Sequence, residues 1–302
     1  MIRQKPVLFS VICFTALALL LSTSQPLNRA AGQSLEWAAG SDLLGQIGGG
    51  SYAVDYAGGF IYLGVGPRVY IYNAFNLNSP YRVAVSALLP GIVQDIKAAG
   101  DYLFATLGEG GLAVLNVSIK SAPVVVSIYD TPGFAKGLWL ANEYLYVADG
   151  TNGVVKLNVS TPPTIQLTAT FDKSSNARDV MVSNPNGSDD KLFIADGSAG
   201  ILALRPTDGE FVDVVDSPGF AEALAIIPPN IYLADGSSGV ELYQFTAQNT
   251  FRLDTFIYQN DTPGYAQDVI ANEPLIYIAD GTGGFTVFNR IPDALLLKGN
   301  YN

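Results

Sequence analysis

The chain has 302 residues, of which 49% are hydrophobic and 14% are charged, and its formal charge is −11. This length is enough for one large β domain or two ordinary domains. The chain contains no His and one Cys, Cys13. This composition excludes catalytic sites in which a His activates a nucleophile, and zinc sites of the usual ligand type. The acidic balance opposes binding to nucleic acid or to an anionic membrane.

The first thirty residues predict a secretory signal peptide. Arg3 and Lys5 precede the apolar stretch PVLFSVICFTALALLLS, which is followed by small and polar residues. We expect cleavage between Ser24 and Ala31, with an uncleaved membrane anchor as the alternative. Cys13 would leave with this segment, so the remaining chain could form no disulfide. That chain would carry 13 basic and 27 acidic residues, which suits a soluble extracellular protein.

Residues 31–42 are predicted to form a short linker, and six related units follow over residues 43–302. Each unit contains an aligned Gly after an apolar run, and these are Gly66, Gly108, Gly150, Gly197, Gly236 and Gly281. Their spacings are 42, 42, 47, 39 and 45 residues. The longest spacing contains SNPNGSDD at residues 183–190, which is predicted to be a loop insertion. An internal period of this length indicates a repeat architecture.

Each unit contains four runs that are typical of β-strands. In the third unit they are AKGLWLA, YLYVADG, GVVKLNVS and TIQLTATF. The second run is apolar at nearly every position, as expected for a strand covered on both faces. Sheets that bury both faces must stack on neighbours, and radial stacking gives a β-propeller. The sequence therefore predicts an all-β, six-bladed β-propeller of four-stranded antiparallel blades, or seven blades if the chain is a fragment.

A second motif recurs between the fourth run of one unit and the first run of the next. It reads DTPGFA at 130–135, DSPGFA at 216–221 and DTPGYA at 261–266. Asp can bond the backbone ahead of it, Pro fixes φ, and Gly allows a positive φ, so the motif predicts a turn. In a propeller this turn marks the crossing from one outer strand to the next inner strand.

These motifs resemble those of LVIVD-repeat proteins. The namesake strand is matched by LAVLN at 112–116, VVKLN at 154–158, and the further runs ILALR, VELYQ, FTVFN and VYIYN. The resemblance covers about residues 43–298 and implies a β-propeller at a bacterial or archaeal surface. It implies no general reaction. The final Asp of the namesake strand is Asn, Arg or Gln here, so a role tied to that Asp does not transfer.

Four units have an Asp in the tight turn after the second run, namely Asp149, Asp196, Asp235 and Asp280. Because strand direction alternates within a blade, these turns and the crossings should share one face. Asp-Gly is preferred in tight connections, and the carboxylate can accept backbone N–H groups. We expect these residues to stabilise their own turns. The alternative is a shallow acidic face, and one carboxylate in each turn is too few for a Ca²⁺ site, so no metal is expected.

The starts of the inner strands differ between units. In units two to six, the residue before the aligned position is Gln94, Lys136, Arg178, Glu222 and Gln267. The next residue is Asp95, Gly137, Asp179, Ala223 and Asp268, and unit one is aligned through Val54-Asp55. These positions should surround one mouth of the central channel. Their mixed charge predicts an anionic or carbohydrate-like ligand on Lys136 and Arg178, with Glu222 opposite. The alternative is a solvated channel lining in which Asp side chains tie adjacent strands.

The sequence favours a non-catalytic binding module, secreted or at the cell surface of a prokaryote. We expect a protein or carbohydrate ligand at an exposed propeller face, no cofactor, no nucleic acid, and a monomeric chain. Membrane contact is expected only through the signal segment, if it stays uncleaved. The alternative is a carboxylate-based hydrolase or lyase at the channel mouth, although no spacing identifies a second acid as a partner for Glu222.

Both ends of the repeat region carry a run that resembles a fourth strand, at residues 41–50 and 293–302. Six complete units would leave one of these runs over. Either the N-terminal run completes the last blade, or the C-terminal run leads toward further sequence.

Overall fold

The structure, a computed structural model, describes residues 51–76, 79–183, 190–245, 255–272, 274–291 and 294–301. The predicted signal peptide, the predicted linker and the first residues of the predicted propeller lie outside the described residues, as does most of the predicted loop insertion. Within these ranges the one helix is the 3-10 helix η1 (Gly281–Gly283), and no helix is long and apolar enough to cross a bilayer.

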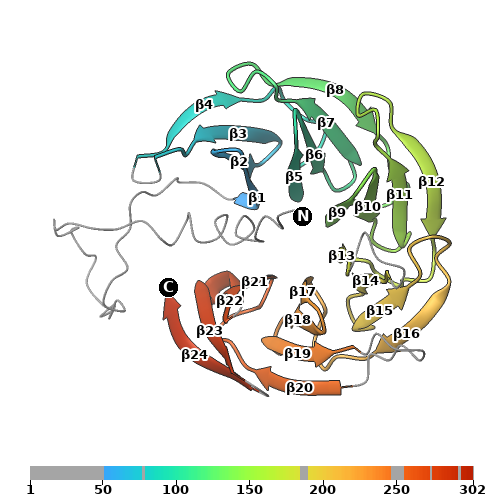
Figure 1. Ribbon diagram of the computed structural model, residues 1–302, viewed down its shortest axis with the longest axis vertical. Helices are drawn as coiled ribbons and strands as arrows, with labels where there is room; N and C mark the ends of the chain where they lie inside the picture. The colour runs from blue at the N-terminus through green and yellow to red at the C-terminus, as the bar shows by residue number, and fades with distance from the viewer. Residues whose placement is uncertain are drawn as a thin grey trace, which may run out of the picture.

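Six four-stranded antiparallel sheets lie radially around a central axis and follow one another along the chain (Figure 1). Blade 1 contains β1 (Ser51–Ala57), β2 (Phe60–Val65), β3 (Arg68–Asn73) and β4 (Tyr81–Val85). Blade 2 contains β5 (Asp95–Ala99), β6 (Tyr102–Thr106), β7 (Leu112–Asn116) and β8 (Val124–Tyr129). Blade 3 contains β9 (Leu138–Ala141), β10 (Tyr144–Ala148), β11 (Val154–Asn158) and β12 (Gln166–Phe171).

The second half of the ring has the same construction. Blade 4 contains β13 (Asp179–Val182), β14 (Leu192–Ala195), β15 (Ile201–Leu204) and β16 (Phe211–Val215). Blade 5 contains β17 (Ala223–Ile227), β18 (Asn230–Ala234), β19 (Val240–Gln244) and β20 (Thr255–Asn260). Blade 6 contains β21 (Asp268–Asn272), β22 (Leu275–Ala279), β23 (Phe285–Ile291) and β24 (Ala294–Tyr301).

The predicted six blades of four antiparallel strands are therefore confirmed. Each blade runs in chain order from its inner to its outer strand, and β24 pairs with β23 as the outer strand of blade 6. The interpretation in which an N-terminal strand completes the last blade is wrong, because the C-terminal run already fills that place.

A register shift interrupts the pairing of the third and fourth strands in every blade. A β-bulge of this kind bends the strand and increases its right-handed twist. The repeated position of the shift means that each outer strand turns away from its blade in the same manner.

The core lies between blades, which explains the apolar second runs. In β10, Leu145 and Val147 pack with blade 2 side chains, whereas Tyr146 and Ala148 pack with blade 4 side chains. All four are at most 4% exposed. Successive residues of a strand point to opposite faces, so a strand between two neighbouring blades must be apolar at every position.

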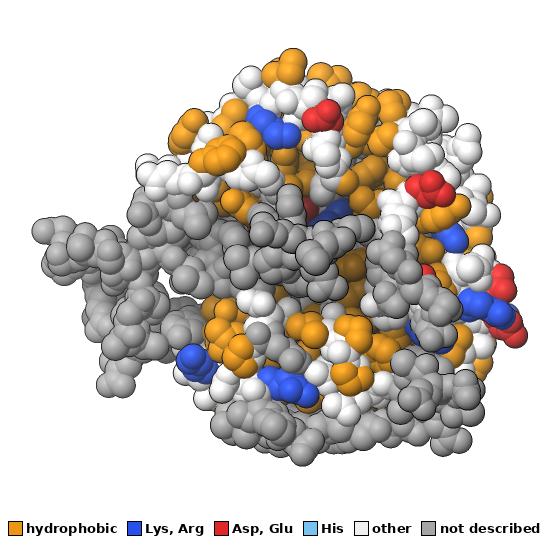
Figure 2. Space-filling view, in the orientation of Figure 1, with side chains coloured by type: hydrophobic (Ala, Val, Ile, Leu, Met, Phe, Trp, Pro, Cys, Tyr) orange, Lys and Arg blue, Asp and Glu red, His pale blue; other side chains and the backbone are white. Residues whose placement is uncertain are grey.

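The outer strands are less covered, and several large apolar side chains on them are exposed. Val124 is 57% exposed, Leu167 is 55% exposed and Phe211 is 53% exposed. In the view of Figure 2, charged side chains are few and scattered among hydrophobic and other side chains. This agrees with the low charged fraction of the chain.

Candidate functional site

Four of the six aligned Gly residues join their blade to the next. Gly150 N–H donates to the Ala177 carbonyl at 3.1 Å, and Ala177 N–H donates back at 2.9 Å. Equivalent bridges link Gly108 to Ala135, Gly197 to Ala221, and Gly236 to Ala266. Gly150 has a φ of 61°, a conformation that side chains disfavour. Gly therefore recurs at this position for a reason of backbone conformation. The turn needs a positive φ there, and its backbone must also bond the following crossing.

The turn Asp residues accept hydrogen bonds from the crossing that enters their own blade. Asp149 Oδ2 accepts from Gly133 N–H at 2.8 Å, whereas the Asp149 turn is closed by backbone bonds such as Asp149 N–H to the Gly153 carbonyl at 2.8 Å. The same contact joins Gly219 to Asp235 and Gly264 to Asp280. The prediction that each Asp carboxylate accepts hydrogen bonds from its own turn is wrong. Backbone N–H and carbonyl groups of the turn bond one another, so the carboxylate is left to accept from the crossing.

Asp196 follows the same principle with different donors. Its carboxylate accepts from Ser174 Oγ at 2.6 Å and from Asn176 N–H at 2.6 Å. All four turn Asp residues are at most 3% exposed, so they do not form the acidic face considered above. Burial raises the pKa of Asp149 and of Asp235, against the hydrogen bonds that each receives from its crossing.

The predicted mouth residues occupy equivalent places in five blades. The backbone N–H of each donates to the adjacent second strand, with Gln94 bonding Thr106, Lys136 bonding Ala148, Arg178 bonding Ala195, Glu222 bonding Ala234 and Gln267 bonding Ala279. These distances lie between 2.8 and 2.9 Å. Their shared backbone position confirms the alignment of units two to six.

The alignment of unit one is wrong by two residues. Ala53 pairs with Gly64, as Asp95 pairs with Thr106 at the corresponding place two residues before the aligned Gly. Tyr52 therefore takes the mouth position in blade 1, and Asp55 lies two residues further along the strand. The error comes from matching Asp55 to Asp95 by residue type, whereas Ala53 and Asp95 each lie 13 residues before the aligned Gly of their unit.

Glu222 is the centre of a cluster at the mouth. Its Oε2 accepts hydrogen bonds from Lys136 Nζ, from Arg178 Nε at 3.1 Å and from Arg178 Nη2 at 2.8 Å. Its Oε1 accepts from the Tyr265 hydroxyl at 3.1 Å. Lys136 comes from blade 3, Arg178 from blade 4, Glu222 from blade 5, and Tyr265 from the crossing into blade 6. The structure therefore brings together the three charged residues that the sequence aligned.

The cluster carries one net positive charge. Burial acts to raise the pKa of Glu222, but the charges and hydrogen bonds of Lys136 and Arg178 bring it below its usual value. The Glu222 side chain is 9% exposed, whereas those of Lys136 and Arg178 are 23% and 26% exposed. The carboxylate is thus covered, and the two cations remain accessible at the mouth.

Two aromatic residues of the crossing motif support this cluster, and sequence reasoning missed both. The Arg178 guanidinium lies 5.5 Å from the centroid of the Phe220 ring. Burial, and then the neighbouring Glu222, raise the pKa of Tyr265 to about 12, so its hydroxyl stays a donor. One signal was available, since Tyr265 is the one hydroxylated residue at the fifth position of the three quoted crossing motifs.

The two predicted Gln residues lie outside the cluster. Gln94 Nε2 donates to the Ile92 carbonyl at 3.2 Å, within its own crossing. Gln267 is exposed, and its amide lies beside the Gly281 turn, 3.6 Å from the place of a Cβ there. Both remain at the mouth by position, but neither contacts Glu222 through a hydrogen bond among the described residues.

Inner-strand Asp residues tie neighbouring blades together. Asp95 Oδ2 accepts from Leu138 N–H at 3.0 Å, and Asp179 Oδ2 accepts from Leu224 N–H at 2.9 Å. Burial, reinforced by Asp179, raises the pKa of Asp95 to about 8 and that of Asp268 to about 7. The alternative interpretation of Asp side chains as ties between strands is thus confirmed, and it coexists with the charged cluster.

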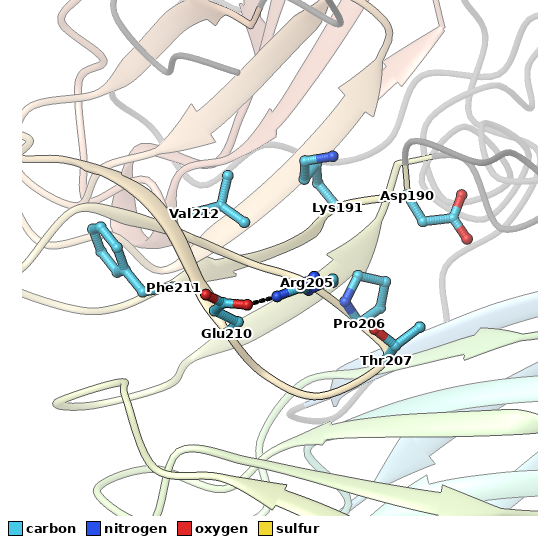
Figure 3. A pocket seen from close by; sticks show the side chains of 8 residues that line it. All are labelled: Asp190, Lys191, Arg205, Pro206, Thr207, Glu210, Phe211 and Val212. Carbon is cyan, nitrogen blue, oxygen red and sulfur yellow. Dashed lines mark ion pairs between the residues drawn. The ribbon is translucent and has the colours of Figure 1, made fainter. Parts of the chain in front are cut away.

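A separate pocket of about 520 Å³ lies at the other edge of blade 4, between the loops that precede β14 and β16 (Figure 3). Arg205 pairs there with Glu210 and, at 2.9 Å, with Asp208. None of the predicted site residues lines this pocket. In the part of the chain that the structure describes, no group of three or more His, Cys, Asp and Glu side chains is arranged to hold a metal ion.

Comparisons with known proteins agree with the repeat and the fold. The LVIVD repeat model matches residues 90–131, 132–172 and 263–288, so the chain contains LVIVD repeats as its motifs predicted. A search of curated proteins found no match.

Solved structures with a similar fold include two bacterial proteins and one yeast protein. A "putative 6-phosphogluconolactonase" from Bacteroides fragilis NCTC 9343 has a TM-score of 0.73 and 14% identity, covering 87% of this chain and 88% of that chain. A second protein of that description, from Bacteroides uniformis ATCC 8492, has a TM-score of 0.70 and 11% identity, covering 85% and 87%. Saccharomyces cerevisiae Sqt1 has a TM-score of 0.64 and 9% identity, covering 83% and 74%. At these identities the likeness concerns the fold alone.

Proposed function

We propose that this protein is a secreted or cell-surface binding module whose ligand carries an anionic group and lies at the channel mouth. One observation carries the proposal. Side chains that differ from blade to blade, Lys136, Arg178 and Glu222, meet in a single cluster, although their backbones occupy equivalent places. The fold alone would allow the same residue type at this position in every blade. The difference between blades therefore points to a ligand.

The two cations have hydrogen-bonding capacity to spare. Nε and Nη2 of Arg178 donate to Glu222, which leaves further N–H groups of a guanidinium that has five. Lys136 likewise has three donors and uses one on Glu222. Both side chains are partly covered, and a charge-assisted hydrogen bond is stronger in such a site than in open water. An incoming carboxylate or phosphate would therefore find a preformed pair of donors.

Binding measurements on single variants test this proposal. A panel of acidic and neutral oligosaccharides and acidic peptides would be screened on the wild-type protein. We expect Arg178→Ala to weaken binding of the best anionic hit tenfold or more. Arg205→Ala is the matched control, because this Arg belongs to the same blade, is 47% exposed and lies at the other edge. An affinity unchanged in the double variant of Lys136→Ala and Arg178→Ala would move the function to the blade surfaces.

A carboxylate-based hydrolase is the second candidate. Asp95 and Asp268 would hold a proton close to neutral pH, as a general acid must, whereas Glu222 would be ionised. Two proteins of similar fold are described as a "putative 6-phosphogluconolactonase", so a phosphorylated sugar lactone is the substrate that we propose to test. Release of acid from 6-phosphogluconolactone would be followed with wild type and Asp95→Asn. A rate no higher than the spontaneous one would reject this candidate.

Secretion is part of the proposal, supported by the signal-like first thirty residues. Expression in a bacterial host, followed by N-terminal sequencing of extracellular protein, should give a start between residues 24 and 31. Protein retained in the membrane fraction with an intact N-terminus would favour the anchor instead. We further propose a monomer that does not bind nucleic acid, which sedimentation of the purified protein with and without DNA would test.

A further inference from the structure

Exposed apolar side chains lie beside one half of the channel mouth. The residue two places before each mouth residue in blades 2 to 6 is Ile92, Phe134, Asn176, Phe220 and Tyr265. Ile92 is 49% exposed, and Phe134 is 42% exposed. In blade 1, Tyr52 occupies the mouth position itself and is 71% exposed. Blades 1 to 3 therefore present exposed apolar side chains at the mouth, and the charged cluster begins at Lys136 of blade 3.

Phe134 is held in place by glycine turns. A Cβ on Gly108 would lie 2.8 Å from the Phe134 ring, and a Cβ on Gly150 would lie 3.5 Å from Phe134 Cβ. The ring thus lies against the turn of blade 2 and beside the turn of blade 3, with its remaining surface open to solvent. It is also two residues from Lys136. Its position is fixed without a ligand, so binding to it would require little loss of side-chain freedom.

The aromatic residues of the mouth divide into two roles. Phe220 lies under the Arg178 guanidinium, and Tyr265 donates to Glu222, so both support the charged cluster. Among the described residues, no polar contact or ring contact engages Phe134 or Tyr52. These two rings are therefore available to a ligand.

We infer that the ligand is an acidic oligosaccharide, whose sugar rings lie on Phe134 and Tyr52 and whose carboxylate is held by Lys136 and Arg178. This inference rests on the proposed function and names its ligand class. The C–H groups on one face of a pyranose ring complement the negative face of an aromatic ring. Vicinal hydroxyl groups suit planar polar side chains, and Gln94 supplies one at the mouth position of blade 2.

The spacing within blade 3 fits this arrangement. Phe134 lies two residues before Lys136, with Ala135, which bridges to Gly108, between them. A pyranose ring on Phe134 can therefore extend its exocyclic carboxylate toward the Lys136 ammonium. The acid would also face Arg178, which pairs with carboxylates through two parallel bonds. An acidic peptide would use the same cations, and triglutamate is the probe that distinguishes it from the sugar.

Calorimetry on the full chain with three probes tests the inference. The probes are trigalacturonate, its methyl ester as the uncharged sugar, and triglutamate as an anion that is not a sugar. We expect trigalacturonate to bind, the methyl ester to bind at least tenfold more weakly, and triglutamate to bind more weakly than trigalacturonate. Phe134→Ala should weaken trigalacturonate binding about five- to tenfold, and Phe134→Tyr should restore it. Phe211→Ala, which removes a 53% exposed ring far from the mouth, should leave it unchanged.

The outcomes separate this inference from the proposed function. If triglutamate binds as well as trigalacturonate, and Phe134→Ala changes neither while Arg178→Ala weakens both, the anionic site stands and the sugar assignment is wrong. Failure of trigalacturonate to bind at millimolar concentration would also overturn the sugar assignment. If no probe responds to Arg178→Ala, the proposed function itself fails. Thermal melting of each variant would establish that it is folded.

Discussion

Replacement of Glu222 by Gln should have opposite effects on stability and on ligand binding. The amide keeps the size of the side chain and can still accept from the Tyr265 hydroxyl, but it removes the negative charge shared by Lys136 and Arg178. The two cations would then face each other without a counter-charge. We expect this loss to destabilise the fold and, at the same time, to make the mouth more attractive to an anion.

The structure allows both magnitudes to be worked out. Removing one partner of a buried ion pair costs about 3 to 5 kcal/mol. Here the cations are about a quarter exposed, so solvent reduces the expected cost to roughly 2 to 3 kcal/mol. A unit charge at about 5 Å, with an effective dielectric constant between about 20 and 80, contributes roughly 1 to 3 kcal/mol. Anion affinity should therefore rise roughly 5- to 100-fold.

Denaturant unfolding and calorimetry would measure the two effects on the same preparation. The pH dependence gives a further check, because the pKa of Glu222 is lowered in the folded state. Its contribution to stability is present above its unfolded pKa and is lost as the pH falls through the folded value. Glu222→Gln should lack that acid-side loss. Unchanged stability together with weaker anion binding would refute the reasoning, since Glu222 would then contact the ligand directly.

Three further predictions concern the turns, the core and the channel. Asp149→Ala should lower the free energy of unfolding by about 1 to 3 kcal/mol in urea, because Gly133 N–H loses its acceptor, and it should leave ligand affinity intact. Burial raises the pKa of the fully buried Glu241 to about 7, so the wild type should lose stability as the pH rises from about 4.5 to 7, and urea melts of Glu241→Gln should show less of this loss. Ionisation of Asp95 and Asp268 adds negative charge in the channel, so titration calorimetry should show anion affinity falling as the pH rises through 7 to 8, and Asp268→Asn should reduce that fall.

The sequence predicted the blades because their causes are local and repeated. The second runs are apolar at successive positions, and the aligned Gly residues mark left-handed turns, such as that of Gly150 with its φ of 61°. These signals recur in every unit, so each supports the others. The completion of blade 6 by β24 was open, because the runs at both ends resemble a fourth strand and only pairing distinguishes them.

The site was predicted in part. Sequence alignment placed Lys136, Arg178 and Glu222 at equivalent positions, but it could not show that the three side chains meet, because their lengths and rotamers decide this. Tyr265 was missed because it belongs to the crossing motif, whose residues were interpreted as turn formers. Tyr52 was missed because unit one was aligned on Asp55 by residue type, although the 13-residue spacing to Gly66 points to Ala53. The meeting of the three charged side chains depends on side-chain reach, which has no local sequence signal, whereas the hydroxyl of Tyr265 and the spacing in unit one were signals that the sequence carried.

The kind of hydrogen bond made at each repeated position explains which positions vary. At the turns, the Asp149 carboxylate itself bonds the crossing, so another residue type would leave Gly133 N–H unsatisfied, and the same residue recurs in four blades. At the mouth, the bond between strands is made by the backbone N–H of Lys136 or Arg178, which every residue except Pro can supply. The side chain at this position is therefore not needed for the pairing of strands within its own blade. Its identity could therefore diverge between blades without loss of the ring, and that freedom is what allows a symmetric scaffold to hold an asymmetric site.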